Sequence, residues 1–320
     1  MRITPTRVLA PLLISALLAA AAGCGGDNNQ GGGGGGGGGG TSASEQPGKG
    51  KPPVTIGTKD FTEEFVLGEL YKGALEAKGY KVNLKKNIGA TEITDKAMTS
   101  GKIDGYPEYS GESTATVFGI NKLYKSPEDT VADAKTHYEQ RGQVVSNATP
   151  FEDVDAVATT KQFAQKNGLA ELADLKKLPS FTLGARPEFK SRQVGLKGMQ
   201  DVYGIKNAKF RQLALGLQYK ALDKGDVDSA NIFSTDAQLA SGKYTVLKDP
   251  KGVFGFQNVL FVINKPKYQA LGGAAFMDII NKVNSLLTAE AMRSMNSAVD
   301  IDKKDPADVA KAFLDANKLT

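Results

Sequence analysis

The sequence predicts an α/β fold in which mainly parallel β-sheet structure is flanked by helices. Short runs rich in β-branched residues alternate along the chain with segments of helical periodicity, and glycines stand where these segments turn. The same order occurs in two consecutive blocks. Such alternation is typical of parallel sheets covered by helices. The 320-residue chain is long enough for two lobes or for one large domain.

The first block contains two strand and helix units. Residues 54–57 form a short β-rich run, and Asp60 followed by Glu63 is typical of a capping box that opens a helix ending near Gly79. On that helix, the apolar positions expected to be buried are Phe65, Val66, Leu70 and Leu75. The segments expected to follow are a strand over residues 80–84, a helix over residues 91–100 that Gly101 stops, and a strand that begins at Ile103.

Residues 104–114 are expected to form a loop that leads into another helix. The stretch reads Asp104-Gly-Tyr-Pro-Glu-Tyr-Ser-Gly-Glu-Ser-Thr, so a proline, two glycines, two tyrosines and three small hydroxyl residues lie close together. Such a loop exposes aromatic faces together with backbone N–H groups. These groups are suited to holding a small charged molecule without reacting with it.

The second block has the same order of elements. Its expected elements are a strand over residues 154–159, a helix over 161–168, a strand over 181–185, a helix over 215–223 and a strand over 227–233. An apolar strand over residues 254–263 and two helices over residues 272–287 and 305–317 complete the chain. The last helix is detached from the second block, and we expect it to return to the first.

The chain begins with a segment typical of export. Arg2 and Arg7 precede an apolar run over residues 8–22 that is too short to span a bilayer comfortably, which indicates a signal peptide over residues 1–23. Two alanines and a glycine stand directly before the only cysteine, Cys24. This arrangement resembles the lipobox of bacterial lipoproteins, which implies that Cys24 is lipidated. We therefore expect an exported protein that is anchored to the outer face of the cell membrane.

A low-complexity segment follows the cysteine. It contains ten consecutive glycines over residues 31–40 and a stretch rich in Ser, Pro and Lys that runs to Pro53. Polyglycine loses the most backbone entropy on ordering, and the segment has too few apolar residues to build a core. Residues 24–53 are therefore predicted to be a disordered tether.

Composition excludes several classes of function. The formal charge of +5 falls to +3 without Arg2 and Arg7, and the remaining charges are interleaved, so we expect no nucleic-acid partner. The only histidine, His137, stands on what is expected to be an exposed helix, and no nucleophile elbow, phosphate loop or His/Cys metal cluster is present. We expect no enzyme activity, cofactor or metal, although composition alone leaves a paired-carboxylate hydrolase open.

Four motifs carry a resemblance to a known family. They are Gly57-Thr-Lys-Asp-Phe-Thr-Glu-Glu, Tyr106-Pro-Glu-Tyr-Ser-Gly, Phe233-Ser-Thr-Asp, and Met295-Asn followed by Asp305-Pro-Ala-Asp-Val-Ala-Lys-Ala-Phe-Leu. In this order the chain resembles the substrate-binding proteins of glycine betaine, carnitine and choline ABC importers, the OpuAC-like family, over residues 54–320. The resemblance implies a two-lobed periplasmic-binding-protein fold of type II, with a ligand in the cleft between the lobes.

The resemblance also implies how the chain is divided. The lobe crossings are expected near residues 150–157 and 248–256. Lobe 1 then comprises residues 54–151 and 256–320, and lobe 2 comprises residues 152–255. The partners it implies are a small-molecule amine, a membrane permease and an ATPase, and we expect a monomer.

Several site residues are implied position by position. In the family, four aromatic rings surround a quaternary ammonium, while a Lys, an Arg and a small hydroxyl residue hold the ligand carboxylate. Lys59 matches the lysine, Tyr109 and Phe233 match two rings, and Arg192 matches the arginine that follows a Glu-Phe pair. Asp153 is expected to contribute its backbone carbonyl.

Three positions depart from the family pattern. Glu112 stands where a hydroxyl residue is usual, Asp155 where a tyrosine is usual, and Gln257 where the last tyrosine is expected, with Phe256 one residue away. Losing two rings weakens a betaine cage by roughly one to three orders of magnitude. Glu112 would repel a ligand carboxylate unless Lys59 or Arg192 neutralises it. Asp155 favours ligands with N–H donors, so we predict a small cationic or zwitterionic nitrogen compound that need not be glycine betaine.

Each of these residues also has a structural interpretation. Tyr109 would then cover a sheet edge, Lys59 would be a solvated loop lysine, Arg192 would pair with Glu188 on the surface, and Phe233 would pack in the core. Two functions stay open as well. The favoured one is a lipid-anchored solute-binding protein that delivers its ligand to a permease, and the alternative is a surface protein of the same fold used for sensing or adhesion.

Overall fold

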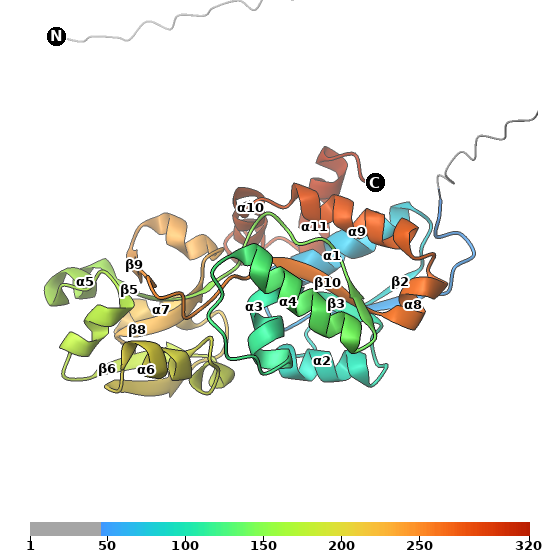
Figure 1. The fold of residues 1–320 in the computed structure, drawn as a ribbon. Coiled ribbons are helices and arrows are strands. Elements are labelled where there is room, and N and C mark those ends of the chain that lie inside the picture. The colour runs from blue at the N-terminus through green and yellow to red at the C-terminus, as the bar shows by residue number, and fades with distance from the viewer. Residues whose placement is uncertain (1–45) are drawn as a thin grey trace, which may run out of the picture. The chain divides into compact units, whose positions relative to one another are not determined.

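The computed structural model describes residues 46–320 (Figure 1). The predicted signal peptide, Cys24 and the polyglycine run lie outside the described residues. Residues 46–53, which were assigned to the tether, instead follow the surface of the folded part, where the Gly48 N–H donates to the Lys78 carbonyl at 2.9 Å. A search of residues 46–320 finds no helix long and apolar enough to cross a membrane.

Two five-stranded sheets form the framework of the described residues. The first has the order β2-β1-β3-β10-β4 and the second has the order β7-β6-β8-β5-β9. In Figure 1, the second sheet lies on the left and the first on the right. The strands of the first sheet are β1 Val54–Gly57, β2 Val82–Lys85, β3 Gly105–Tyr109, β4 Gln143–Val145 and β10 Val259–Asn264. Those of the second are β5 Asp155–Thr160, β6 Phe181–Ala185, β7 Ala208–Gln212, β8 Ser229–Phe233 and β9 Tyr244–Leu247.

The sheets are mixed, which corrects the prediction of mainly parallel sheets. In the first sheet β1 pairs parallel with β2 and β3, whereas β10 pairs antiparallel with β3 and β4. In the second sheet β6 pairs parallel with β7 and β8, whereas β5 pairs antiparallel with β8 and β9. Both exceptions, β5 and β10, are the strands that the chain enters directly from the other sheet. Their direction is set by that path and not by the local sequence.

Helices cover the sheets, and most predicted ones are present with ends that differ by a few residues. With the first sheet pack α1 Thr62–Ala77, α2 Thr91–Thr99, α3 Ser110–Glu112, the π-helical turn η1 Ser113–Val117, α4 Pro127–Gln140, α8 Lys265–Ala270, α9 Ala274–Leu286, α10 Ala289–Asp300 and α11 Pro306–Ala316. With the second pack α5 Lys161–Asn167, α6 Leu196–Tyr203, α7 Gln218–Lys224 and the short 3₁₀ helices η2 Leu172–Lys177, η3 Pro187–Lys190 and η4 Ala237–Ser241. Helix α11 packs against α1, which confirms the expected return to the first block. The strands β4, β7 and β9 and the helices α6, α8 and α10 were not predicted.

The predicted capping box at the start of α1 is wrong. The helix begins at Thr62, and its N-cap residue, Phe61, offers no side-chain hydrogen bond. Glu63 is buried instead of reaching back to Asp60, because its carboxylate accepts hydrogen bonds from Tyr109 and from residues of other elements. Of the apolar positions predicted on this helix, Phe65 is only half-buried.

The predicted loop over residues 104–114 is also wrong in its first half. Residues 105–109 form the central strand β3, and all of them are buried. The Ser110 N–H donates to the Asn258 carbonyl, so alternation along the pair places Pro107 and Phe261 in a non-hydrogen-bonded pair. On its other side, β3 pairs with β1 only at Gly105. Pro107 therefore needs no N–H in either ladder, which explains a proline in a central strand.

Two segments connect the sheets. Residues 146–154 lead from β4 to β5, and residues 248–258 lead from β9 to β10. They lie side by side, since Glu152 and Asn258 form an antiparallel bridge and the Asp153 N–H donates to the Gln257 carbonyl at 3.1 Å. The lobe crossings expected from the resemblance overlap these segments.

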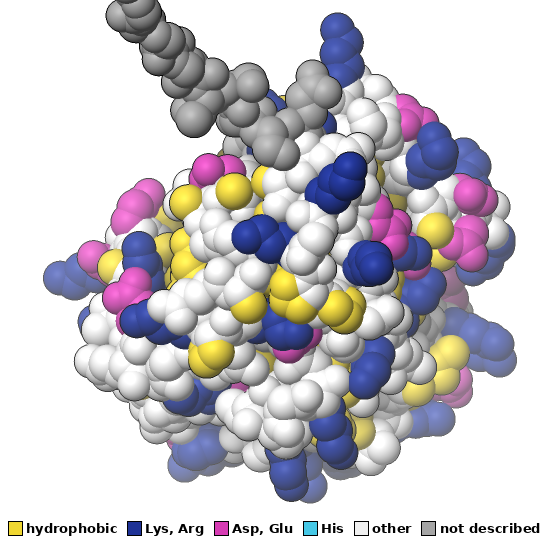
Figure 2. Space-filling view, turned by 90° about the vertical axis from the view of Figure 1, so that its right-hand side faces the viewer, with side chains coloured by type: hydrophobic (Ala, Val, Ile, Leu, Met, Phe, Trp, Pro, Cys, Tyr) yellow, Lys and Arg dark blue, Asp and Glu magenta, His cyan; other side chains and the backbone are white. Residues whose placement is uncertain are grey.

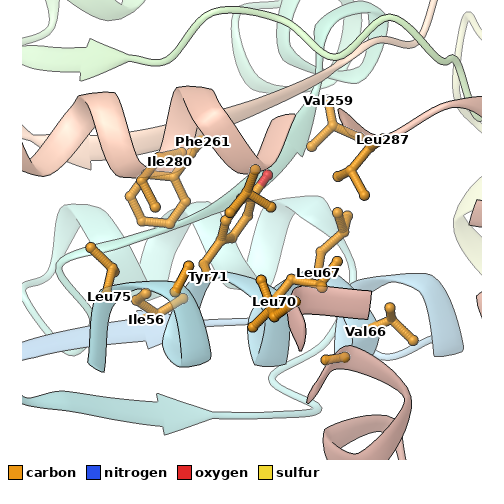
Figure 3. Packing of buried hydrophobic residues seen from close by; sticks show 14 of the residues in the cluster. Ile56, Val66, Leu67, Leu70, Tyr71, Leu75, Val259, Phe261, Ile280 and Leu287 are labelled. Atoms are coloured by element: carbon orange, nitrogen blue, oxygen red, sulfur yellow. The ribbon is translucent and has the colours of Figure 1, made fainter. Parts of the chain in front are cut away.

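The largest apolar core lies between α1, the first sheet and α9. Figure 3 shows Tyr71 rising from α1 toward Phe261 of β10 and Ile280 of α9. The rings of Tyr71 and Phe261 meet edge to face with centroids 5.2 Å apart. The Tyr71 hydroxyl donates to the Asn284 side chain at 2.7 Å, which satisfies its buried polar end. On the molecular face drawn in Figure 2, Lys and Arg side chains are interspersed with Asp and Glu and do not form a basic stripe.

Replacing Leu70 with alanine tests this core. Leu70 is fully buried, so Leu70→Ala should lower the free energy of unfolding by about 2–5 kcal/mol, as measured by urea denaturation. Ile93 is 57% exposed and serves as the control. Ile93→Ala should change the free energy of unfolding by less than about 0.5 kcal/mol. Equal effects of the two substitutions would contradict the packing described here.

Candidate ligand-binding site

All eight ligand-binding residues predicted from the sequence line one pocket, which we call the central pocket. Its lining residues are Lys59, Asp60, Phe61, Ala90, Thr91, Tyr109, Glu112, Asp153, Asp155, Arg186, Glu188, Arg192, Leu215, Phe233 and Gln257. Several of them follow or end the strands β1, β3, β6 and β8. The carboxyl ends of parallel strands are where α/β proteins usually bind ligands.

Three aromatic rings stand in the central pocket, one more than the sequence analysis identified. Phe61 lies between the two predicted rings, with its centroid 6.1 Å from that of Tyr109 and 5.3 Å from that of Phe233. The ring planes are nearly parallel, at 28° and 14°. Phe61 was not predicted. The sequence did contain a signal for it, since Phe61 is an aromatic residue within the otherwise polar loop that carries Lys59.

Both predicted rings face a cation that belongs to the protein. The Lys59 ammonium lies 4.3 Å from the centroid of Tyr109, and the Arg186 guanidinium carbon lies 5.2 Å from that of Phe233. These are cation–π distances. Arg186 was also missed by the sequence analysis, although it directly follows the predicted strand over residues 181–185 and so stands at a strand's carboxyl end.

Lys59 is buried, with 3% of its surface exposed, and lies against the acidic side chains of Glu108 and Glu64. Its ammonium donates to Glu108 of β3 and lies 3.7 Å from Glu64 of α1. Burial opposes the charged form of Lys59, but the carboxylates of Glu108 and Glu64 outweigh it, so the pKa of Lys59 is raised. A solvated loop lysine is therefore excluded.

Arg186 is paired with Asp155. Its two terminal nitrogens donate to the two carboxylate oxygens at 2.7 and 2.8 Å, and the Asn231 amide donates to Asp155 at 2.7 Å. The carboxylate therefore already has three protein donors. Asp155 is thus neutralised by Arg186, so a ligand N–H at this carboxylate would compete with the guanidinium.

Arg192 joins elements of the two sheets. It lies between β6 and β7 in the chain, and it contacts Glu112 of α3 at 3.0 Å and Glu92 of α2 at 2.8 Å. The alternative pairing of Arg192 with Glu188 is wrong, since Glu188 lies 3.4 Å from Arg186. Glu112 is thus neutralised by one of the two basic residues expected to do so, and its N–H is held by the Gln257 side chain at 3.1 Å.

A buried cluster of acids adjoins the rings. The Tyr109 hydroxyl donates to Glu63 at 2.9 Å, and the Thr235 hydroxyl lies 2.7 Å from both Glu63 and Asp153. A hydroxyl has one hydrogen, so it cannot donate to two carboxylates at once. Burial raises the pKa of Glu63 and of Asp153, and the proximity of Glu63 raises that of Asp153 further. Burial of the two acids at this distance therefore favours the protonated form in the pair.

The family of the protein can be read from its sequence. The model of the substrate-binding domain of ABC-type glycine betaine transport systems matches residues 52–316. The chain belongs to this family. A family relative, the glycine-betaine-binding protein of Pseudomonas aeruginosa, is 30% identical over 82% of this chain and 88% of its own length.

Two further comparisons extend the family context. The ergothioneine transport permease/ergothioneine binding protein of Helicobacter pylori is 28% identical over 82% of this chain, and this chain spans 47% of that longer protein. A crystal structure described as a glycine betaine/carnitine/choline ABC transporter superposes with a TM-score of 0.67 at 24% identity, covering 83% of this chain and 99% of its own. This likeness confirms the two-lobed α/β fold.

The titration of Glu64 gives a test of the buried charges. Burial raises the pKa of Glu64 to about 8, against the opposing effect of Lys59. Since the carboxyl of an unfolded chain titrates near 4.3, the folded state holds an extra proton between that pH and about 8. The free energy of unfolding should therefore fall as the pH rises through this window, by up to about 1.4 kcal/mol per pH unit from this group.

The substitution Glu64→Gln removes this titration. In thermal unfolding scans, the melting temperature of Glu64→Gln minus that of the wild type should increase from pH 5 to pH 8, because only the wild type loses stability from this titration. Glu76 lies on the same helix but is exposed, so Glu76→Gln should keep the pH dependence of the wild type. A pH profile of Glu64→Gln that parallels the wild type would contradict the assignment.

Proposed function

We propose that the protein is a non-catalytic solute-binding protein of an ABC importer and that it captures a small cationic or zwitterionic nitrogen compound in the central pocket. The observation that carries the proposal is the group of three rings, Tyr109, Phe61 and Phe233, at the carboxyl ends of strands of both sheets. Family membership supports the importer role, and the H. pylori and P. aeruginosa relatives are named for binding ergothioneine and glycine betaine.

The charge of the central pocket also favours a cation. Five acidic side chains line it, against the three basic ones Lys59, Arg186 and Arg192. Each of these bases is already paired with a carboxylate. A ligand carboxylate would therefore have to displace a protein carboxylate, whereas a ligand cation adds the charge that the pocket lacks. The proposed roles of Lys59 and Arg192 are to neutralise Glu108 and Glu112 first, and to hold a ligand carboxylate only if these pairs open.

Binding requires the rings to separate. The central pocket has a volume of about 40 Å³. Since a water molecule needs roughly 10–15 Å³ of such space, the pocket holds only a few water-sized groups. We propose that residues 54–151 with 256–320 and residues 152–255 form the two lobes, and that they move apart about the connecting segments. The contacts Thr235 to Glu63 and Arg192 to Glu92 cross between them and would break on opening.

The cellular location belongs to the same proposal. Processing at Cys24 would leave a lipidated N-terminus and a glycine-rich tether, which would hold the binding domain at the outer face of the membrane. The proposed partners are a membrane permease and an ATPase, with the binding protein itself a monomer. Metabolic labelling with a clickable palmitate analogue should mark the wild type and not Cys24→Ala. Labelling of both proteins would exclude Cys24 as the lipidated residue.

Identification of the ligand tests the proposal most broadly. Mass spectrometry of the protein purified without denaturation should reveal a co-purified amine, and calorimetry with glycine betaine, choline, carnitine and ergothioneine should then rank their affinities. Uptake of the bound compound should be lost on deletion of the gene. Binding with unchanged uptake would favour sensing or adhesion instead, and micromolar glycine betaine binding without preference for N–H donors would end the altered-specificity hypothesis.

Removing rings should weaken binding in a predictable way. Phe61→Leu and Phe233→Leu should each raise the dissociation constant of the identified amine by about 2- to 30-fold, the effect of roughly 0.5–2 kcal/mol per ring. Phe210 is a half-buried ring on β7 that does not line the central pocket, so Phe210→Leu is the matched control and should bind normally. Unchanged affinity in both pocket variants would contradict the placement of the site.

A further inference from the structure

A second and larger cavity lies beside the central pocket, and we call it the acidic chamber. Its volume is about 340 Å³, and the two spaces share Asp60, Phe61, Asp153, Leu215 and Phe233. The stacked rings of Phe61 and Phe233 therefore stand between them. Within residues 46–320, the acids that line the chamber are Asp60, Glu63, Asp153, Asp236 and Asp300, and the one basic residue that lines it is Lys303.

The hydroxyl groups that line the acidic chamber are already used. Thr62 donates to Asp300 at 2.6 Å, Tyr219 donates to Asp236 at 2.8 Å, and Thr235 lies between Glu63 and Asp153. Among residues 46–320, the second carboxylate oxygen of Asp300, and likewise that of Asp236, has no protein donor. The ammonium of Lys303 donates to the Asp300 backbone carbonyl at 2.6 Å. With five acidic side chains against one ammonium, the lining of the chamber has more charged acceptors than charged donors.

A buried amide adds an independent sign of a ligand. Asn296 of α10 is 4% exposed and lines the acidic chamber. Its NH₂ group donates to Glu63 at 3.0 Å and to the Thr235 carbonyl at 3.4 Å, which fixes the orientation of the amide. Its carbonyl oxygen has no partner within the described part of the chain. Leaving a buried acceptor unpaired costs roughly 1–3 kcal/mol, so a donor from a ligand is expected here.

The chemistry of the lining selects among cations. Among the described residues, no group of His, Cys, Asp and Glu has an arrangement that could hold a metal ion. A quaternary ammonium has no N–H to give to the free carboxylate and amide oxygens, whereas a primary ammonium or a guanidinium donates several charge-assisted hydrogen bonds. An N–H-bearing organic cation therefore matches both the charge and the hydrogen-bonding groups of the chamber.

We propose that the acidic chamber is a second subsite that binds a primary ammonium or guanidinium group of the ligand. This inference rests on the proposed function, since the rest of the same ligand lies against Phe61 and Phe233. The favoured ligand is thus an extended compound with two cationic ends, one among the rings and one in the chamber. This subsite also replaces Asp155 as the place where ligand N–H groups are recognised.

A matched pair of probes tests the role of the N–H groups. (3-Aminopropyl)trimethylammonium and propane-1,3-bis(trimethylammonium) have the same spacing and charge, but only the first has N–H donors. In calorimetry with the full chain, the first should bind roughly tenfold or more tightly, as expected for a charged hydrogen bond. Equal affinities of the two dications would overturn the proposal.

Variants of the acidic chamber give a second test. Asp300→Asn should weaken binding of the aminopropyl probe roughly tenfold and leave choline affinity unchanged. Asp302 is exposed two residues away, so Asp302→Asn is the matched control and should bind both compounds normally. Asn296→Leu should weaken binding of the aminopropyl probe as well. Unchanged affinity for this probe in Asp300→Asn overturns the subsite, whereas failure of Phe61→Leu to affect any ligand overturns the proposed function instead.

Discussion

Pairing of buried charges is the constraint on which the binding region depends. Lys59, Arg186 and Arg192 are each at most 8% exposed. A buried cation is costly unless a carboxylate lies against it. Their partners come from other strands and helices, and through Arg192 from the other sheet. The same ion pairs hold the ends of β1, β3 and β6 in place. Because these strand ends carry the pocket residues, the pairing of buried charges also shapes the site.

This constraint bears on specificity. In the family pattern that the sequence resembles, a lysine and an arginine hold the ligand carboxylate, and tyrosines surround the ligand cation. Here Lys59 and Arg186 themselves face the rings of Tyr109 and Phe233. A ligand cation must therefore share or replace positions that protein cations occupy, and it gains most where carboxylates are in excess. The departures at Glu112, Asp155 and Gln257 serve these protein contacts, since they bind Arg192, Arg186 and the Glu112 backbone.

Much of the fold and of the site could be predicted from the sequence, for reasons that also explain the failures. Periodicity and glycine turns located the strands around Ile56 and Leu183. The family motifs contain Lys59, Tyr109 and Phe233, and the other predicted lining residues were placed by matching positions to the family pattern. The direction of β5 and of β10 depends on the preceding strand lying in the other sheet. The local sequence of β5 and β10 does not contain this information. Glu63 resembles a capping residue, and only the tertiary contacts with Tyr109 and Thr235 turn it inward. Arg186 and Phe61 were missed because their importance arises from partners distant in sequence.

The most direct test of the account is a crystal structure of the protein with its ligand bound. We expect a ligand nitrogen within about 6 Å of the Phe61 ring centroid. We also expect the Phe61 centroid to lie farther than the present 6.1 Å from that of Tyr109, or farther than the present 5.3 Å from that of Phe233. A ligand bound elsewhere, with the three rings stacked as they are now, would contradict it.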